Sequence, residues 1–139
     1  MSRRILTGIT TTGIPHIGNY FGSIKPALQL SSEKNVSSYF FLADLHAIIK
    51  QTNPNEIKVS VNEVALAWLS SGLDPEKSFF YRQSNIPEIT ELAWILSCVT
   101  AKGLINRSHA YKAAVQLNHD HTKDEDKGIS MGLFSYPVL

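Results

Sequence analysis

The stretch Gly-Ile-Pro-His-Ile-Gly-Asn, residues 13–19, decides how the fold of this chain is interpreted. It follows a short apolar run, residues 5–7, that predicts a buried strand, and a polar stretch bounded by glycines, residues 8–13, that predicts a turn. From Ile17 onward, apolar residues recur with helical spacing. A strand, a turn and a helix start in this order form a phosphate site, because the first N–H groups of a helix lack partners within it and the helix dipole favours an anion.

Three residues in this stretch suit such a site. His16 can donate to a phosphate oxygen, and Asn19 adds another donor. Gly18 lets a nucleotide approach the backbone without meeting a Cβ atom. Taken alone, the pattern H-x-G-N leaves a second interpretation open, because single histidines near helix starts are often caps or surface residues. Its place after a strand and a glycine-bearing turn puts the nucleotide interpretation level with the cap interpretation, and the rest of the chain has to decide between them.

The whole chain reads as an α/β protein with the order β–α–β–α–β–α. Strands are expected at residues 4–7, 38–42 and 78–82. These short, nearly continuous apolar runs are typical of parallel strands that are covered on both faces. A helix kink or break is expected at Pro26, because proline removes a backbone donor and clashes with the preceding turn.

Two helices have clear boundaries. Asn53 predicts an N-cap, with Pro54 at the first helical position, Glu56 in capping-box spacing and Gly72 as the stop. The expected buried face of this helix consists of Ile57, Val61, Val64, Ala65, Trp68 and Leu69. A second helix is expected to start near Pro87, and its apolar face consists of Ile89, Leu92, Ala93, Leu96 and Val99.

Composition limits the class of protein without deciding it. With 139 residues, 43% of them hydrophobic, the chain makes one soluble domain at most. A net charge of +1 gives no general basic field, so an RNA contact would need a local patch. Cys98 lies in an apolar run and is expected to be a buried small hydrophobe. A single cysteine, no secretory leader and no long apolar span predict a cytoplasmic protein that does not enter membranes.

The charged run at residues 118–127, Asn-His-Asp-His-Thr-Lys-Asp-Glu-Asp-Lys, predicts a flexible surface loop at about 118–128. His119 and His121 with Asp120 suggest a metal site only superficially, because a mobile loop lacks a preformed cage. No protein-bound metal is therefore expected.

Four segments in order carry a resemblance to a known family. The first comprises residues 8–13, Gly-Ile-Thr-Thr-Thr-Gly, and residues 15–22, Pro-His-Ile-Gly-Asn-Tyr-Phe-Gly. The second is residues 42–48, with its D-x-H-A-I turn; the third is 72–77 followed by Gln-Ser-Asn-Ile-Pro-Glu at 83–88; the last is 131–139. Together they resemble the class I aminoacyl-tRNA synthetases. The likeness is closer to the tryptophanyl than to the tyrosyl enzymes, because Asn19 stands where the tyrosyl enzymes usually have a second histidine.

This resemblance implies a Rossmann-like parallel sheet with flanking helices, with residues 1–139 as the N-terminal part of the nucleotide-binding catalytic domain. The rest of that domain, with the lysine-bearing K-M-S-K-S-type loop, would follow. The implied reaction activates L-tryptophan with ATP and transfers it to tRNA(Trp), in a homodimer that binds no DNA. Mg²⁺ would be held by the phosphates and water, with no organic cofactor.

The resemblance also implies roles for single residues. The catalytic pair is His16 and Asn19. Contacts with ATP are implied for Thr10, Thr11, Thr12, Gly18, Asn19 and Lys112. The amino-acid pocket is implied to include Leu6, Ala43, His46 and Tyr136. Thr10 replaces the family's usual glutamine and Thr11 its proline, so the contact at position 10 departs from the family pattern.

Several alternatives stay open on the sequence. Leu6 also suits plain strand core, His46 a structural hydrogen bond, and Lys112 a solvated helix face. A nucleotidyltransferase of the H-x-G-H type would share the phosphate site, although residues 83–88 and 136–139 argue against it. A non-catalytic truncated domain that acts as a pairing or RNA-binding module is the other alternative.

Overall fold

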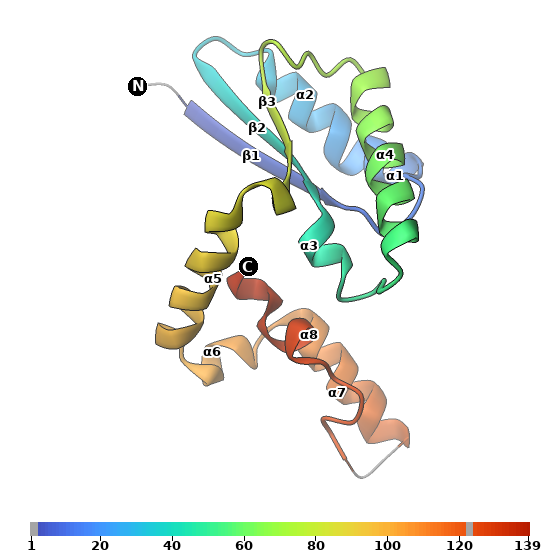
Figure 1. Cartoon of the computed structure of the whole chain (residues 1–139), viewed down its shortest axis with the longest axis vertical. Helices are drawn as coiled ribbons and strands as arrows, with labels where there is room; N and C mark the ends of the chain where they lie inside the picture. Colours follow the sequence, from blue (N-terminus) through green and yellow to red (C-terminus); the bar gives the residue numbers. More distant parts are fainter. Residues whose placement is uncertain (1–2, 122–123) are drawn as a thin grey trace. The chain divides into compact units, whose positions relative to one another are not determined.

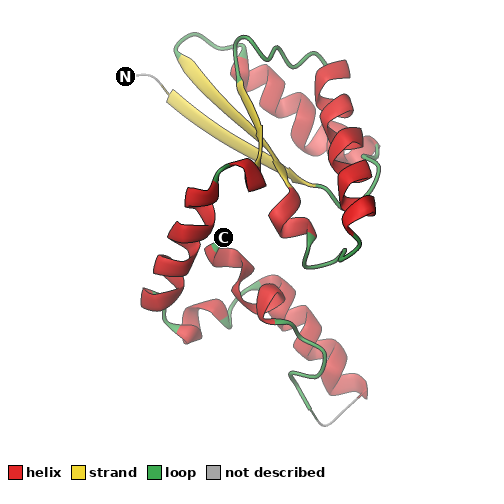
Figure 2. Cartoon of the chain, in the orientation of Figure 1, coloured by secondary structure: helices red, strands yellow, loops and turns green. Residues whose placement is uncertain are grey.

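The computed structural model describes residues 3–121 and 124–139, which form two compact units, Met1–Asn85 and Ile86–Leu139. Figure 1 labels the helices and strands, and Figure 2 distinguishes them by colour. The first unit contains, in order, β1 (Arg3–Thr10), α1 (Ile17–Asn19), a π-helical turn (Tyr20–Ile24), α2 (Lys25–Ser31), β2 (Val36–Ala43), α3 (Asp44–Ala47), α4 (Pro54–Ser70), β3 (Phe79–Arg82) and a 3₁₀ turn (Gln83–Asn85).

The three strands form a parallel sheet in the order β1-β2-β3, so the expected α/β class is confirmed. Its register pairs Thr10 with Ala43 and Leu42 with Arg82. The first strand is longer than the sequence indicates, because β1 continues through residues 8–10, where a turn was expected. Pairing with β2 over the full length of β1 outweighs the polar composition of that segment.

One face of the sheet packs against α2 and α4 (Figure 1). The core there consists of Ile9, Ile24, Ala27, Phe40, Leu42, Val61, Val64, Trp68 and Leu73. On the other face, Tyr39 stacks on Phe79 with ring centroids 4.7 Å apart, and these side chains are half-buried or exposed. Within the described part of this unit, helices α2 and α4 cover the same face of the sheet.

Helix α4 begins and ends as expected, with one difference at its cap. Asn53 Oδ1 accepts the N–H of Asn55 at 3.0 Å, and Pro54 occupies the first turn. Glu56 bonds the side chains of Gln51 and Asn53 instead of the backbone N–H of Asn53, which donates to Gln51 Oε1. Gly72, at φ +101°, follows the last turn in a conformation that favours glycine.

The break expected at Pro26 is not present, and the helix instead contains a π-helical turn just before the proline. Residues 17–31 run helically without a gap, but Tyr20–Ile24 is a π-helical turn and Pro26 lies in the first turn of α2. Proline has no backbone N–H to donate to the preceding turn, and the wider π-helical turn changes the hydrogen-bond spacing where that donor is lacking.

The second unit is helical, with α5 (Pro87–Val99), α6 (Lys102–Ile105), α7 (His109–His121), α8 (Met131–Ser135) and a 3₁₀ turn (Tyr136–Val138). Helix α5 starts at Pro87 as expected, but it buries no residue: Leu92, Ile95 and Val99 are exposed. Cys98 is exposed too, so its expected burial is wrong. Leu69 of α4 is likewise 43% exposed, contrary to its expected place in the core.

Residues 118–121 belong to helix α7, so the loop expected at 118–128 is wrong for them. The amide of Asn118 donates to the carbonyl oxygens of Glu125 and Lys127 at 2.7 and 2.9 Å, and Tyr111 donates to Asp126 at 2.9 Å. These bonds tie the charged segment 124–127 to the helix. Among the described residues, no helix combines the length and apolar character needed to cross a membrane.

Candidate active site

The carboxyl ends of the three parallel strands lie at one edge of the sheet, where ligands bind in open α/β folds. Thr10 ends β1, Ala43 ends β2 as its cross-strand neighbour, and Arg82 ends β3. The polar segments that follow these ends, 11–19, 44–47 and 83–85, therefore belong to the same edge.

His16 and Asn19 form a reciprocal cap at the start of α1. The N–H of Gly18 donates to His16 Nδ1 at 3.0 Å, and the N–H of His16 donates to Asn19 Oδ1 at 2.9 Å. Because Nδ1 accepts a hydrogen bond, the proton of the ring lies on Nε2. The local interactions thus prepare one imidazole donor, Nε2–H, on an exposed side chain.

A hollow of about 170 Å³ lies beside this cap. Its walls are formed by Ile9, Thr10, Thr12, Gly13, Ile14, Pro15, His16, Asn19 and Val64. Three residues with implied ATP contacts, Thr10, Thr12 and Asn19, therefore line one hollow together with His16. Its walls offer hydroxyl, amide and imidazole groups and no carboxylate, which is a lining suited to an anion.

Thr11 and Gly18 are not part of this lining. Thr11 is fully buried, with its hydroxyl unpartnered, so the implied contact of Thr11 with ATP would need a change of conformation. Gly18 lies behind the imidazole: a Cβ atom there would be 2.8 Å from His16 Cε1 and 2.9 Å from Nδ1. A side chain at position 18 would therefore displace the histidine ring.

At the end of β2, a buried polar contact joins two strand ends. His46 Nδ1 lies 3.0 Å from Oε1 of Gln83, whose side chain is almost fully buried. The structural hydrogen bond considered for His46 is thus present, and it does not exclude a role in binding. Ala43 is buried, whereas Leu6 is 65% exposed and is not part of the described core of this chain.

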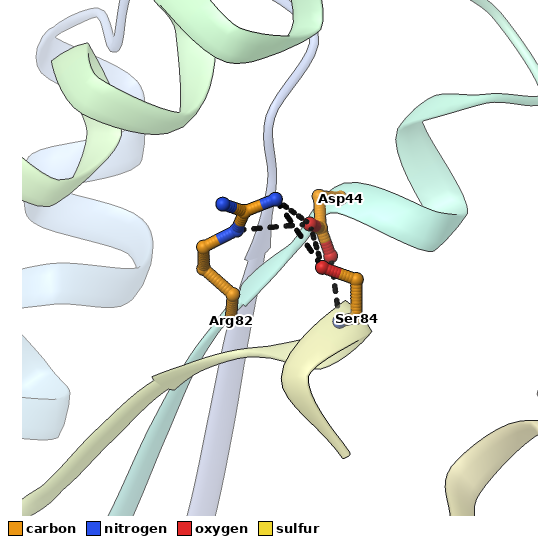
Figure 3. Close-up of polar contacts among 3 residues, drawn as sticks. All are labelled: Asp44, Arg82 and Ser84. Atoms are coloured by element: carbon orange, nitrogen blue, oxygen red, sulfur yellow. Dashed lines mark hydrogen bonds and ion pairs between the residues drawn. The ribbon is translucent and has the colours of Figure 1, made fainter. Parts of the chain in front are cut away.

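Next to this pair, Asp44 accepts hydrogen bonds from Arg82, the last residue of β3, and from Ser84 just after it (Figure 3). Its Oδ2 accepts from Arg82 Nε and Nη2, both at 3.2 Å, and from the Ser84 hydroxyl at 2.5 Å. Its Oδ1 accepts the Ser84 N–H at 3.0 Å. Burial alone raises the pKa of Asp44, but the bonds from Ser84 and Arg82 outweigh it and hold this pKa below its usual value.

Lys112 and Tyr136 belong to the second unit. Lys112 is exposed on α7, which leaves both of its interpretations open, and Tyr136 is half-buried at the start of the 3₁₀ turn. Among the described residues, no three side chains of the His, Cys, Asp and Glu types are grouped so as to hold a metal ion.

Arg82 was not expected as a site residue, and Asp44, Gln83 and Ser84 entered the sequence analysis only as parts of motifs. Their positions share one feature that the sequence shows: each lies at the end of an apolar strand or just after it, and such positions of a parallel sheet meet at one edge. The pairing itself joins residues about 40 positions apart, which no local pattern reveals.

A family model described as tRNA synthetases class I (W and Y) matches residues 2–139, nearly the whole chain. The chain belongs to this family. It is 60% identical over 139 residues to the tryptophan–tRNA ligase of Pseudomonas putida, and it covers 31% of that protein. The present chain therefore spans about a third of the length of this curated relative.

Solved structures agree with this membership. The crystal structure of the Campylobacter jejuni tryptophanyl-tRNA synthetase matches with a TM-score of 0.82 and 39% identity, over 99% of this chain and 40% of that one. The same enzyme complexed with ADP and tryptophan matches with a TM-score of 0.81 and 39% identity, over 97% and 39% of the two chains. The expected resemblance to the tryptophanyl enzymes is therefore confirmed.

Proposed function

We propose that this chain forms part of the ATP- and tryptophan-binding domain of a tryptophan–tRNA ligase. The observation that carries the proposal is the hollow at the end of β1, lined by Thr10, Thr12, His16 and Asn19, in a chain of this family. The names of its relatives, and the ADP and tryptophan bound by the Campylobacter enzyme, support the choice of substrates.

In the proposed reaction, a carboxylate oxygen of L-tryptophan attacks the α-phosphorus of ATP. The bond from that phosphorus to the bridging oxygen breaks, and pyrophosphate leaves with the electron pair. A hydroxyl at the 3′ end of tRNA(Trp) then attacks the carbonyl carbon of the adenylate, and AMP leaves. Such chemistry depends on positioning and charge stabilisation, which suits a site of hydrogen-bond donors without a nucleophile.

His16 and Asn19 are the proposed catalytic pair. The Nε2–H of His16 would donate to a phosphate oxygen, while Asn19 holds the histidine backbone and keeps its amide nitrogen as a further donor. Thr10 and Thr12 would add hydroxyl contacts, and Lys112 a positive charge. Mg²⁺ would arrive with the nucleotide, since the lining offers no carboxylate to hold the ion.

Tryptophan is assigned to the edge where β2 ends. Ala43 offers a small buried wall, and His46 is fixed in place by Gln83. Leu6, exposed on β1, would pack against the substrate, and Tyr136 would approach its ammonium group. A homodimer working in the cytoplasm completes the proposal. The exposed apolar side chains of α5 support the pairing of two copies.

The proposed function predicts that the full-length ligase exchanges pyrophosphate into ATP only when tryptophan is added. The measurement is ATP–pyrophosphate exchange with each of the twenty amino acids in turn. Exchange driven by tyrosine instead, or exchange that needs no amino acid, would overturn the assignment. The second of these outcomes would favour a nucleotidyltransferase of the H-x-G-H type.

Gly18→Ala in the full-length ligase is expected to weaken ATP binding at least about tenfold, or about 1.4 kcal/mol. The added Cβ atom would displace the His16 ring that lines the hollow, because it would come within 3 Å of two ring atoms. Calorimetric titration with ATP measures the effect. Gly22→Ala is the matched control, since a Cβ atom there meets nothing within 4 Å. Equal ATP affinity in both variants would show that the ring position does not matter for binding.

A further inference from the structure

We propose that Asp44 is a positioning residue for tryptophan, acting through the end of β3 and Gln83 on the imidazole of His46. The inference rests on the proposed function, because it takes His46 as part of the tryptophan site. It concerns the cluster formed by Asp44, Arg82 and Ser84 (Figure 3).

The cluster joins the two segments that follow the paired strands β2 and β3. Asp44 and His46 lie in the short helix α3, and residues 82–84 follow β3. Asp44 accepts bonds from the residue before Gln83 and from the residue after it. Gln83 itself reaches His46. The same two segments are therefore tied twice, once by Asp44 and once by the pair that includes the proposed substrate contact.

Burial explains why Asp44 is the fixed partner. Its side chain is 5% exposed, whereas the side chain of Arg82 is 50% exposed. Ser84 is exposed as well, so packing holds neither of the residues that flank Gln83. A buried carboxylate with charged and neutral donors on both oxygens gives directional bonds, which set the backbone of residues 82–84 and thereby the reach of Gln83.

A purely packing role does not account for this arrangement. Removing a carboxylate from water costs free energy, and an apolar side chain of similar volume often serves stability as well or better. The four hydrogen bonds of Asp44 instead specify where the chain turns after β3. The expected consequence is a defect in tryptophan binding and not in ATP binding, because Asp44 and Gln83 do not line the hollow beside His16.

The test is Asp44→Asn in the full-length ligase. The substitution can keep an acceptor for the Ser84 N–H, but it turns the acceptor of the Arg82 bonds into an amide donor. The KM for tryptophan in pyrophosphate exchange is expected to rise at least about tenfold, with the KM for ATP changed less than about twofold. Asp74→Asn is the matched control, because it removes a carboxylate from an exposed ion pair with Lys77 in the same unit.

A double-mutant cycle with His46→Ala separates positioning from general structure. If Asp44 acts through His46, Asp44→Asn raises the KM for tryptophan in the unaltered ligase but not in the His46→Ala background. An equal rise in both backgrounds would overturn the inference. If His46→Ala raises this KM and Asp44→Asn does not, the inference is wrong while the proposed function stands. Absence of tryptophan-dependent exchange in the unaltered ligase would instead defeat the proposed function.

Variants of Arg82 keep the test available if Asp44→Asn does not fold. Arg82→Met removes the guanidinium bonds from a half-exposed position and is expected to raise the KM for tryptophan in the same selective way. Arg82→Lys keeps the positive charge, so the KM for tryptophan is expected to rise less than in Arg82→Met. It should still rise, because one ammonium group cannot reproduce the two-atom contact of the guanidinium group. Identical kinetics in Met and Lys variants, both equal to the unaltered ligase, would contradict the inference.

Discussion

Replacing His16 by alanine in the full-length ligase is expected to lower the rate of tryptophan-dependent pyrophosphate exchange at least about a hundredfold. The substitution removes the Nε2–H donor that the proposed reaction directs at a phosphate oxygen. It also removes the acceptor of the Gly18 N–H and so loosens the start of α1. The rate is measured at saturating ATP and tryptophan, so that weaker binding does not account for the loss.

His16→Asn separates the loss of the Nε2–H donor from the loss of the acceptor for the Gly18 N–H. Asparagine is among the best N-cap residues, and its oxygen can accept the Gly18 N–H in place of His16 Nδ1. Its side chain is shorter and lacks the second ring nitrogen. We expect His16→Asn to retain the thermal stability of the unaltered ligase and to lose activity as His16→Ala does. An asparagine variant with nearly full activity would reduce His16 to a helix cap.

The parts of the fold that depend on neighbouring residues could be predicted from the sequence. Asn53, Pro54 and Gly72 act within a single turn of chain, and α4 begins and ends where they predict. The start of α5 at Pro87 follows the same logic. The length of β1 could not be predicted in this way, because its last residues become a strand only through pairing with β2.

The candidate site divides along the same line. His16, Gly18 and Asn19 interact with one another within four residues, so a local motif was enough to bring them out. The burial of Thr11 and the exposure of Leu6 depend on which face of the sheet the helices cover, and no pattern in β1 states that. The Asp44 cluster required the strand order as well, because its members come from the ends of two different strands.

The chain of 139 residues on its own is expected to catalyse exchange at least about a hundredfold more slowly than the full-length ligase. It spans about a third of the length of its curated relative and contains no lysine-bearing loop of the K-M-S-K-S type. The family resemblance implies that this loop stabilises the leaving pyrophosphate, and loss of one such electrostatic donor is enough for an effect of this size. The measurement compares exchange rates of equimolar chain and ligase at saturating substrates.

The same isolated chain is expected to self-associate, because α5 exposes a row of large apolar side chains that water solvates poorly. Trp94 is 73% exposed and Val99 76% exposed, with Leu92 and Ile95 between and beside them. Sedimentation velocity over a range of concentrations measures the association, and Trp94→Lys is expected to reduce it by placing a charge in the apolar row. The control is Leu117→Lys, at an apolar residue of α7 that is 63% exposed. It adds the same charge outside α5 and is expected to leave the association unchanged. Two results would contradict these expectations: a monomer in sedimentation that unfolds cooperatively at high temperature, and activation of tryptophan at a rate near that of the ligase. Together they would mean that the two described units already contain a complete site.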